Sequence, residues 1–355
     1  MTHVTKCLDA FVKRWLGQGP VRHPNGNHGW PTIRQSSPRW SLALFASLGW
    51  AVHESTLGRS GEAHTRLMSE PAIRDVSDTA FWIAQHRAEE TMRSDALFRD
   101  PFAARLAGER GARIAHDMPA SGFIGWTVAL RTRIIDEFIR DAIDSGVDTI
   151  LNLGAGLDAR PYRMELPEDL KWIEADYARI IEYKEQVLRD AQPLCRLERV
   201  KIDLADRGAR QSMLRDVGMK SQRCLALTEG VIPYLTAEDA AALADDLLEP
   251  PSLRWWVLDY MSSDAQRHRR ARLGKILQNA PFRFRTDDWF SFFAQHGWRA
   301  KELRYYVEES AKVGRAVPLP VWMKALWGVR ALFMSEARRN QLSKSAGYAL
   351  LERVG

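Results

Sequence analysis

The stretch Asp148-Thr-Ile-Leu-Asn-Leu-Gly154-Ala-Gly156-Leu-Asp158 decides the fold of this chain. An apolar run ends at Gly-Ala-Gly, and a helix-compatible segment follows, which is typical of a buried parallel strand that leads into a tight turn. Glycines lack a Cβ atom, so they adopt positive φ and let another molecule approach the backbone. Such turns hold nucleotide-like cofactors at the carboxyl ends of strands, although a purely structural turn has the same letters.

Four further apolar segments follow, and each ends in polar or glycine-bearing residues. Helix-compatible stretches separate them, so the pattern predicts an α/β fold with a mostly parallel, doubly wound sheet. The polar ends of such strands meet at one edge of the sheet, where ligands bind. These ends are Glu174-Ala-Asp176, Asp203-Leu204, Thr228-Glu229-Gly230 and Asp259-Tyr260.

Two of these ends have the chemistry that a nucleoside needs. Asp176 follows the glycine turn by about 20 residues, where a carboxylate accepts hydrogen bonds from ribose hydroxyls. Asp203 and Leu204 follow the next strand and offer a carboxylate and a backbone N–H at the same edge. Both aspartates have a structural alternative, because aspartate also caps helices.

The residues after the turn favour one cofactor over others. No third glycine follows at the position that a dinucleotide fold uses, and Asp158 places negative charge where a pyrophosphate would lie. The same carboxylate suits S-adenosylmethionine, which carries an ammonium and a sulfonium group, although it could also only hold the loop through backbone hydrogen bonds. No phosphate-loop sequence of the Gly-x-x-x-x-Gly-Lys-Ser/Thr type occurs.

Taken in order, these motifs resemble the class I S-adenosylmethionine-dependent methyltransferases of the leucine carboxyl methyltransferase type, which include bacterial polyketide O-methyltransferases. The resemblance covers about residues 76–355. It implies a Rossmann-like, seven-stranded sheet with helical N-terminal additions and a lid insertion at about 261–293. Further segments that carry it are Ser77–Trp82, Asp95–Pro101, Leu130–Arg133 and Gly347–Glu352.

The resemblance also implies roles for individual residues. In it, Asp203 with Leu204 meets the adenine, for which the carboxylate supplies an acceptor and the N–H of Leu204 a donor. Arg131 is expected to meet the methionine carboxylate, although Arg133 on the same predicted helix leaves the choice open, and either could simply be exposed. Glu229 corresponds to the acid after the fourth strand, and it could instead only form an ion pair. The cofactor-binding set is Arg131, Gly154, Gly156, Asp158, Asp176, Asp203, Leu204 and Glu229.

Composition limits the remaining possibilities. Of 355 residues, 45% are hydrophobic and 27% are charged, as in soluble globular proteins. Residues 1–65 hold seven basic and three acidic side chains, so 7 − 3 = +4 of the formal net charge of +6 lies there. We expect this segment to be a poorly ordered or loosely docked extension of a methyltransferase domain at 66–355. Because the rest is close to neutral, we expect no nucleic-acid partner.

Three widely spaced cysteines and the histidine spacing predict no metal site and favour a cytoplasmic location. Ser41–Val52 is too short to span a bilayer. The apolar stretch Leu319–Trp327 suits core or lid packing better than a membrane-surface helix, so we expect no stable membrane association. The basic run Gln266–Arg272 is typical of a solvated helix face rather than of a clamp for an anionic substrate.

The predicted reaction is transfer of a methyl group from S-adenosylmethionine to an oxygen of a small-molecule or carboxylate acceptor. A carboxylate needs no general base, whereas a phenol does. Tyr234 and Tyr260 are candidate catalytic residues, with packing as their alternative role. Two other functions stay open: a nicotinamide-dependent oxidoreductase on a similar sheet, and a non-catalytic relative that only binds the cofactor. Nothing in the sequence indicates an oligomeric state.

Overall fold

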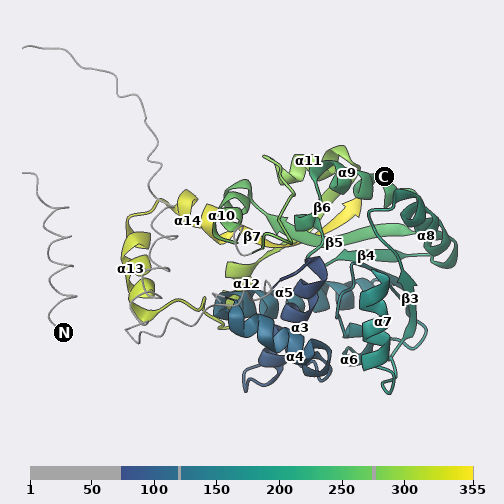
Figure 1. The fold of residues 1–355 in the computed structure, drawn as a ribbon. Coiled ribbons are helices and arrows are strands. Elements are labelled where there is room, and N and C mark those ends of the chain that lie inside the picture. The colour runs from purple at the N-terminus through teal and green to yellow at the C-terminus, as the bar shows by residue number, and fades with distance from the viewer. Residues whose placement is uncertain (1–72, 119–120, 274–276, 355) are drawn as a thin grey trace, which may run out of the picture. The chain divides into compact units, whose positions relative to one another are not determined.

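A seven-stranded sheet with the order β3-β2-β1-β4-β5-β7-β6 organises the protein in a computed structural model (Figure 1). The structure describes residues 73–118, 121–273 and 277–354, so the predicted extension at 1–65 lies outside the described residues. β1 to β5 pair in parallel, and β7 is antiparallel to both β5 and β6. The predicted α/β fold is confirmed. The strands are β1 (Thr149–Leu153), β2 (Lys171–Asp176), β3 (Arg196–Lys201), β4 (Cys224–Thr228), β5 (Leu253–Met261), β6 (Trp298–Tyr305) and β7 (Ala346–Arg353).

Helices cover both faces of this sheet, because alternate side chains of each buried strand point to opposite sides. In β1, Leu151 and Leu153 join a core that includes residues of α8, α9 and α11, whereas Ile150 joins a core on the other side with α5. These helices are α5 (Ser121–Asp144), α8 (Arg207–Lys220), α9 (Ala237–Asp246) and α11 (Trp289–Gln295). A third apolar cluster joins α3 (Val76–Thr91), α4 (Ala103–Asp117) and α7 (Ala178–Val187).

The carboxyl ends of β1 to β5 meet at one edge, which we call the ligand edge. The sheet order reverses between β1 and β4, which is where ligands bind in open α/β sheets. The remaining elements are η1 (Ile232–Tyr234), α6 (Arg160–Arg163) and α10 (Ser263–Leu273), and then α12 (Tyr306–Lys312), α13 (Val321–Leu332) and α14 (Glu336–Ser343).

The insertion at 306–345 starts and ends at this same edge. Tyr305 at the end of β6 pairs with Gly347 near the start of β7, and Met261 at the end of β5 pairs with Ala346. Helices α12, α13 and α14 therefore leave and re-enter the sheet beside the carboxyl ends of the parallel strands. In Figure 1, α13 stands apart from the sheet.

Two sequence expectations differ from the structure. Glu174, expected at a strand tip, lies inside β2 and is fully buried. The charge of its carboxylate is stabilised there because Lys184 Nζ donates to it at 2.6 Å and Arg199 Nε donates to it at 3.0 Å. Of the core or lid packing expected for Leu319–Trp327, the core alternative is wrong for α13, in which no residue is buried, because this helix lies outside the layers of the sheet. The lid alternative stays a prediction. In the described part of the chain, no helix has the length and apolar character to cross a membrane.

Candidate active site

The glycine turn after β1 has the backbone that its sequence predicts. Gly154 and Gly156 have φ of +67° and +51°, and the N–H of Gly154 donates to the carbonyl of Ala175 at 2.8 Å. A Cβ on Gly154 would lie 2.5 Å from Cγ2 of Val231. Both the left-handed conformation and this close approach therefore require glycine at position 154.

Asp176 lies directly against this turn. Its Oδ2 accepts a hydrogen bond from the N–H of Gly156 at 2.6 Å, and its Oδ1 accepts one from the N–H of Tyr177 at 2.7 Å. Burial raises the pKa of the Asp176 carboxyl above its ordinary range. Because a carboxylate has about four acceptor positions, the two oxygens keep capacity for hydroxyl groups of a ligand.

Asp203 and Leu204 lie at the neighbouring strand end. The N–H of Ile202 donates to the carbonyl of Asp176 at 2.9 Å, so the loop after β3 continues alongside the end of β2. The Asp203 carboxylate is exposed and accepts from the N–H of Ala205 at 2.9 Å. Leu204 packs, half-buried, against the core on the α8 side of the sheet. The predicted ribose and adenine residues thus occupy adjacent positions.

Glu229, just after β4, is surrounded by three arginines. Arg87 Nη2 donates to its Oε1 at 2.7 Å and Arg160 Nη1 donates to its Oε2 at 2.7 Å, while Arg131 Nε lies 2.9 Å from Oε1. Burial alone would raise the pKa of Glu229, but the charges of these arginines hold it well below its usual range. Glu229 is therefore an ionised residue that positions arginines at the ligand edge.

The structure brings Arg131, rather than Arg133, to this edge. Residues two positions apart on a helix point in nearly opposite directions. Arg133 Nε accordingly pairs with Oε1 of Glu137 at 2.8 Å, one turn along α5. Arg131 extends to Glu229 and passes close to Gly230, which has a φ of +73°.

Asp158 is buried inside the chain and does not protrude from the turn. Its Oδ2 accepts from Arg160 Nη1 at 2.8 Å and from Asn152 Nδ2 at 3.0 Å, and its Oδ1 accepts from the N–H of Arg160 at 3.0 Å. These contacts match the alternative in which this residue holds the loop. Contact between Asp158 and the cofactor ammonium stays a prediction.

Arg160 pairs with both Asp158 and Glu229, and the sequence analysis assigned it no role. Its side chain is fully buried and also donates from Nε to Asp136 Oδ1 at 2.6 Å. Arg163 donates to the same carboxylate at 2.8 Å. The spacing of Asp158 and Arg160 after a glycine turn could have indicated an ion pair. No local signal identifies Arg87, since it lies 142 residues from Glu229 in the chain.

The candidate catalytic tyrosines lie in different surroundings. The ring of Tyr260 packs against Trp289, Phe290 and Tyr305 at centroid distances of 5.3 to 5.6 Å, which matches its packing alternative. Tyr234 lies on η1 with its ring 5.3 Å from that of Phe282. Burial raises the pKa of both hydroxyls.

Asp259 adds a carboxylate near the end of β5. Its Oδ2 accepts from the N–H of Gly230 at 2.9 Å, and its Oδ1 accepts from the hydroxyl of Tyr348 at 2.9 Å. Burial raises the pKa of Asp259. The predicted strand tip at 259–260 therefore lies inside β5, with Asp259 half-buried next to the loop that carries Glu229.

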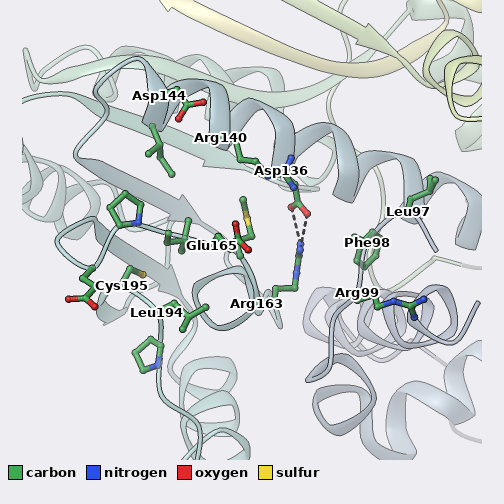
Figure 2. A pocket seen from close by; sticks show the side chains of 16 residues that line it. Leu97, Phe98, Arg99, Asp136, Arg140, Asp144, Arg163, Glu165, Leu194 and Cys195 are labelled. Carbon is green, nitrogen blue, oxygen red and sulfur yellow. Dashed lines mark hydrogen bonds and ion pairs between the residues drawn. The ribbon is translucent and has the colours of Figure 1, made fainter. Parts of the chain in front are cut away.

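A cavity of about 1130 Å³ lies elsewhere in the molecule (Figure 2). It is lined by residues that precede β2 and β3, such as Met164 and Cys195, so it faces the amino ends of these strands. The Asp136–Arg163 ion pair forms part of its wall. None of the predicted site residues lines this cavity, so it is not the candidate active site.

Acid is expected to destabilise the protein through the buried carboxylates. Burial would raise the pKa of Glu229, Asp136 and Asp158, but neighbouring arginines lower it below the ordinary value. The unfolded chain takes up these protons near a pKa of about 4, so the stabilisation is present above that pH and is lost as the pH falls toward the folded pKa values. We expect a loss of about 1.4 kcal/mol per pH unit for each such carboxylate.

Urea unfolding followed by circular dichroism between about pH 7 and about pH 3 measures this slope. The Glu229→Gln variant should show a shallower slope than the unsubstituted protein. Equal slopes would mean that Glu229 does not contribute to the acid sensitivity.

The sheet order, the antiparallel β7, the glycine turn and the acid at the end of β2 together define a class I S-adenosylmethionine-dependent methyltransferase. The profile described as "Leucine carboxyl methyltransferase" matches residues 80–248. The chain belongs to this family of methyltransferases, and S-adenosylmethionine is its cofactor.

Individual relatives agree with this assignment. A protein of Frankia alni is 31% identical over 261 residues, which cover 68% of this chain and 90% of the relative. One of Mycobacterium tuberculosis strain H37Ra is 33% identical over 273 residues, which cover 68% of this chain and 86% of the relative. Both are described as "Putative S-adenosyl-L-methionine-dependent methyltransferase".

A solved structure shares the fold. A DUF574 family protein from Streptomyces avermitilis has a TM-score of 0.50 at 15% identity, and the match covers 76% of this chain and 96% of that chain.

The residues present fit this cofactor. The Asp176 carboxylate, which accepts one N–H group on each oxygen, keeps capacity to accept from two hydroxyls beside the glycine turn. Arg131 supplies the cation that a carboxylate requires, and Glu229 and Asp259 supply negative charge near it. These charged side chains therefore suit a ligand with a ribose, a carboxylate and cationic groups.

Proposed function

We propose that the protein transfers the methyl group of S-adenosylmethionine to an oxygen of a small-molecule acceptor that carries a carboxylate. When bound, the cofactor supplies an electrophilic methyl group on its sulfonium. The observation that supports a carboxylate acceptor is the position of Arg269, on the helix that follows β5 at the ligand edge.

The proposed cofactor contacts follow the arrangement of the strand ends. Asp176 accepts from the ribose hydroxyls, and Asp203 with Leu204 meets the adenine. Arg131 pairs with the methionine carboxylate, and Glu229 acts by holding Arg131 in place at 2.9 Å. The turn at Gly154 and Gly156 provides backbone surface below the cofactor.

Arg269 lies in the basic run Gln266–Arg272, which was expected to be a solvated helix face, but among the described residues it has no carboxylate paired with it. Its Nε is buried and has no hydrogen-bond partner among the described residues, while its guanidinium lies over the ring of Phe282 at 3.9 Å. Burial lowers the pKa of Arg269, and Asp259 and Tyr234 offset only part of that cost. A buried guanidinium keeps its charge, so it favours an anionic partner in the same space.

The tyrosines near Arg269 also favour a carboxylate as the methyl acceptor. Burial raises the pKa of Tyr234, Tyr306 and Tyr348, so their hydroxyls stay protonated at neutral pH and do not act as bases. A carboxylate with a pKa of about 4 is already ionised at that pH and needs no base. The proposed task of the chain is therefore to orient the acceptor oxygen toward the methyl group and to exclude water.

The Arg269→Ala variant tests the acceptor proposal. Radiolabelled methyl transfer to a panel of small carboxylic acids and to their neutral amides should show activity on the acids. We expect Arg269→Ala to lower kcat/KM for an active acid by about 10- to 100-fold, the effect of one charge-assisted contact. Calorimetric affinity for S-adenosylmethionine should not change.

Arg267→Ala is the matched control, because Arg267 lies on the same helix, is exposed and pairs with Asp264. It should retain the activity of the unsubstituted protein. Faster methylation of the neutral amides than of the acids would contradict the proposal, as would full activity in Arg269→Ala. The nicotinamide-dependent alternative is not favoured, since the chain belongs to a methyltransferase family.

A further inference from the structure

Helix α13 presents an apolar face that no described residue buries. Its large residues on one side are between 43% and 85% exposed. At 100° per residue they fall within a sector of about 140°, and no charged residue lies in that sector. We call this set the outer stripe: Val321, Trp322, Leu326, Val329, Leu332 and, at the C-cap, Phe333.

Basic residues accompany the outer stripe. Between residues 319 and 345 the chain has five cationic side chains and one acidic side chain, Glu336, so this segment carries 5 − 1 = +4. On α13 the cations lie outside the apolar sector. The five are Lys324, Arg330, Arg338, Arg339 and Lys344.

This combination fits the surface of an anionic lipid bilayer. A helix with tryptophan, leucine and phenylalanine on one side and basic residues beside them lies in the membrane interface. Anionic headgroups attract each nearby cation, and tryptophan prefers the interface itself. The helix has 12 residues, too few to span the bilayer.

The positive charge of residues 319–345 disfavours two other partners that could cover the outer stripe. A second copy in a two-fold interface would bring one +4 segment against another. The first 65 residues of the chain also carry +4, so they do not complement it either. Apolar surface together with negative charge is what the lipid headgroup region offers.

The segment that carries α13 is attached to the sheet at the edge where the cofactor site is proposed. The segment 306–345 leaves β6 at Tyr305 and returns to β7 at Ala346, both at the ligand edge. We infer that α13 docks the protein reversibly on anionic membranes through the outer stripe, which brings the ligand edge close to the lipid surface.

Vesicle co-sedimentation of the full chain tests this inference. Vesicles of phosphatidylcholine alone and vesicles that also contain phosphatidylglycerol serve as probes. The protein should bind the anionic vesicles, and added salt should weaken binding. Leu326→Glu should lower the partition coefficient by about tenfold, because a half-buried leucine side chain contributes on that scale.

Met219→Glu is the matched control, since it adds the same charge at a side chain on α8 that is 79% exposed. Its vesicle binding should equal that of the unsubstituted protein, and thermal unfolding should confirm that both variants are folded. Three outcomes would overturn the inference: no binding to anionic vesicles, equal loss in both variants, or sedimentation that shows a dimer which Leu326→Glu dissociates. Because these measurements need no acceptor, their result is independent of the proposed reaction.

Discussion

Replacing Arg160 with Met is expected to lower the free energy of unfolding by about 3–5 kcal/mol, the range for breaking a buried ion pair by removing one partner. The Arg160 side chain is fully buried and contacts three carboxylates, those of Asp136, Asp158 and Glu229. Methionine replaces the aliphatic part of the arginine side chain, so the main loss is the guanidinium group with its charge and hydrogen bonds. The three buried carboxylates would then have fewer cationic partners, so the free-energy cost of their desolvation in the folded state would no longer be offset.

Urea unfolding at neutral pH measures this change. Arg105→Met is the matched control, because the Arg105–Asp190 pair is exposed, at 44% and 64% of the two side chains. Exposed pairs contribute about 0–1 kcal/mol, so this variant should stay close to the unsubstituted protein. A similar small effect in Arg160→Met would show that the buried carboxylates find other partners, such as Arg163 and Arg87.

Replacing Asp176 with Ala is expected to weaken binding of S-adenosylmethionine by about 100-fold or more, since two charge-assisted hydrogen bonds contribute about 1.5–3 kcal/mol each. The loss should appear mainly in affinity. Burial raises the pKa of Asp176, so the folded chain without cofactor gains little from holding this charge. Isothermal titration calorimetry with the cofactor and with its demethylated product measures the affinity.

Asp216→Ala is the matched control, because Asp216 is an exposed carboxylate on α8. Its affinity for the cofactor should be unchanged. Asp176→Asn keeps one oxygen acceptor, so its affinity for the cofactor should lie between those of Asp176→Ala and Asp216→Ala. Unchanged affinity in a folded Asp176→Ala protein would remove this residue from the proposed cofactor site.

Much of the fold could be predicted because its signals are local. A buried parallel strand has an apolar run bounded by polar residues, and β1 and β4 have such sequences. Parallel strands with helical crossovers place their carboxyl ends at one edge, so the order of motifs predicts which residues gather there. The segment Gly347–Glu352, which carries part of the family resemblance, lies in β7, and the structure shows that this strand is antiparallel to its neighbours.

Other features depend on contacts between distant residues. Arg87 meets Glu229 across 142 positions of the chain, and Arg160 meets it across 69. No periodicity or motif spacing encodes such pairs, because they form only when helices dock on the sheet. The choice between Arg131 and Arg133 likewise depends on how α5 is rotated against β4.

The surroundings of α13, in the segment 306–345, also could not be predicted from local sequence. The apolar residues of Leu319–Trp327 suggested packing, since helical spacing alone does not distinguish a core helix from one that docks elsewhere. Only the position of α13 outside the sheet layers decides that its apolar face is exposed.

By itself the sequence determined the class of sheet, the glycine turn and the kinds of side chain at the ligand edge, because strand patterns and turn chemistry act over a few neighbouring residues. Tertiary structure decided how those charges are used. It placed Asp158 in an internal ion pair with Arg160, directed Arg131 to Glu229, and left Arg269 without a carboxylate partner among the described residues. The physical reason is that buried charges are stabilised by whichever opposite charge the packed elements bring close, and that distance is set by the fold as a whole.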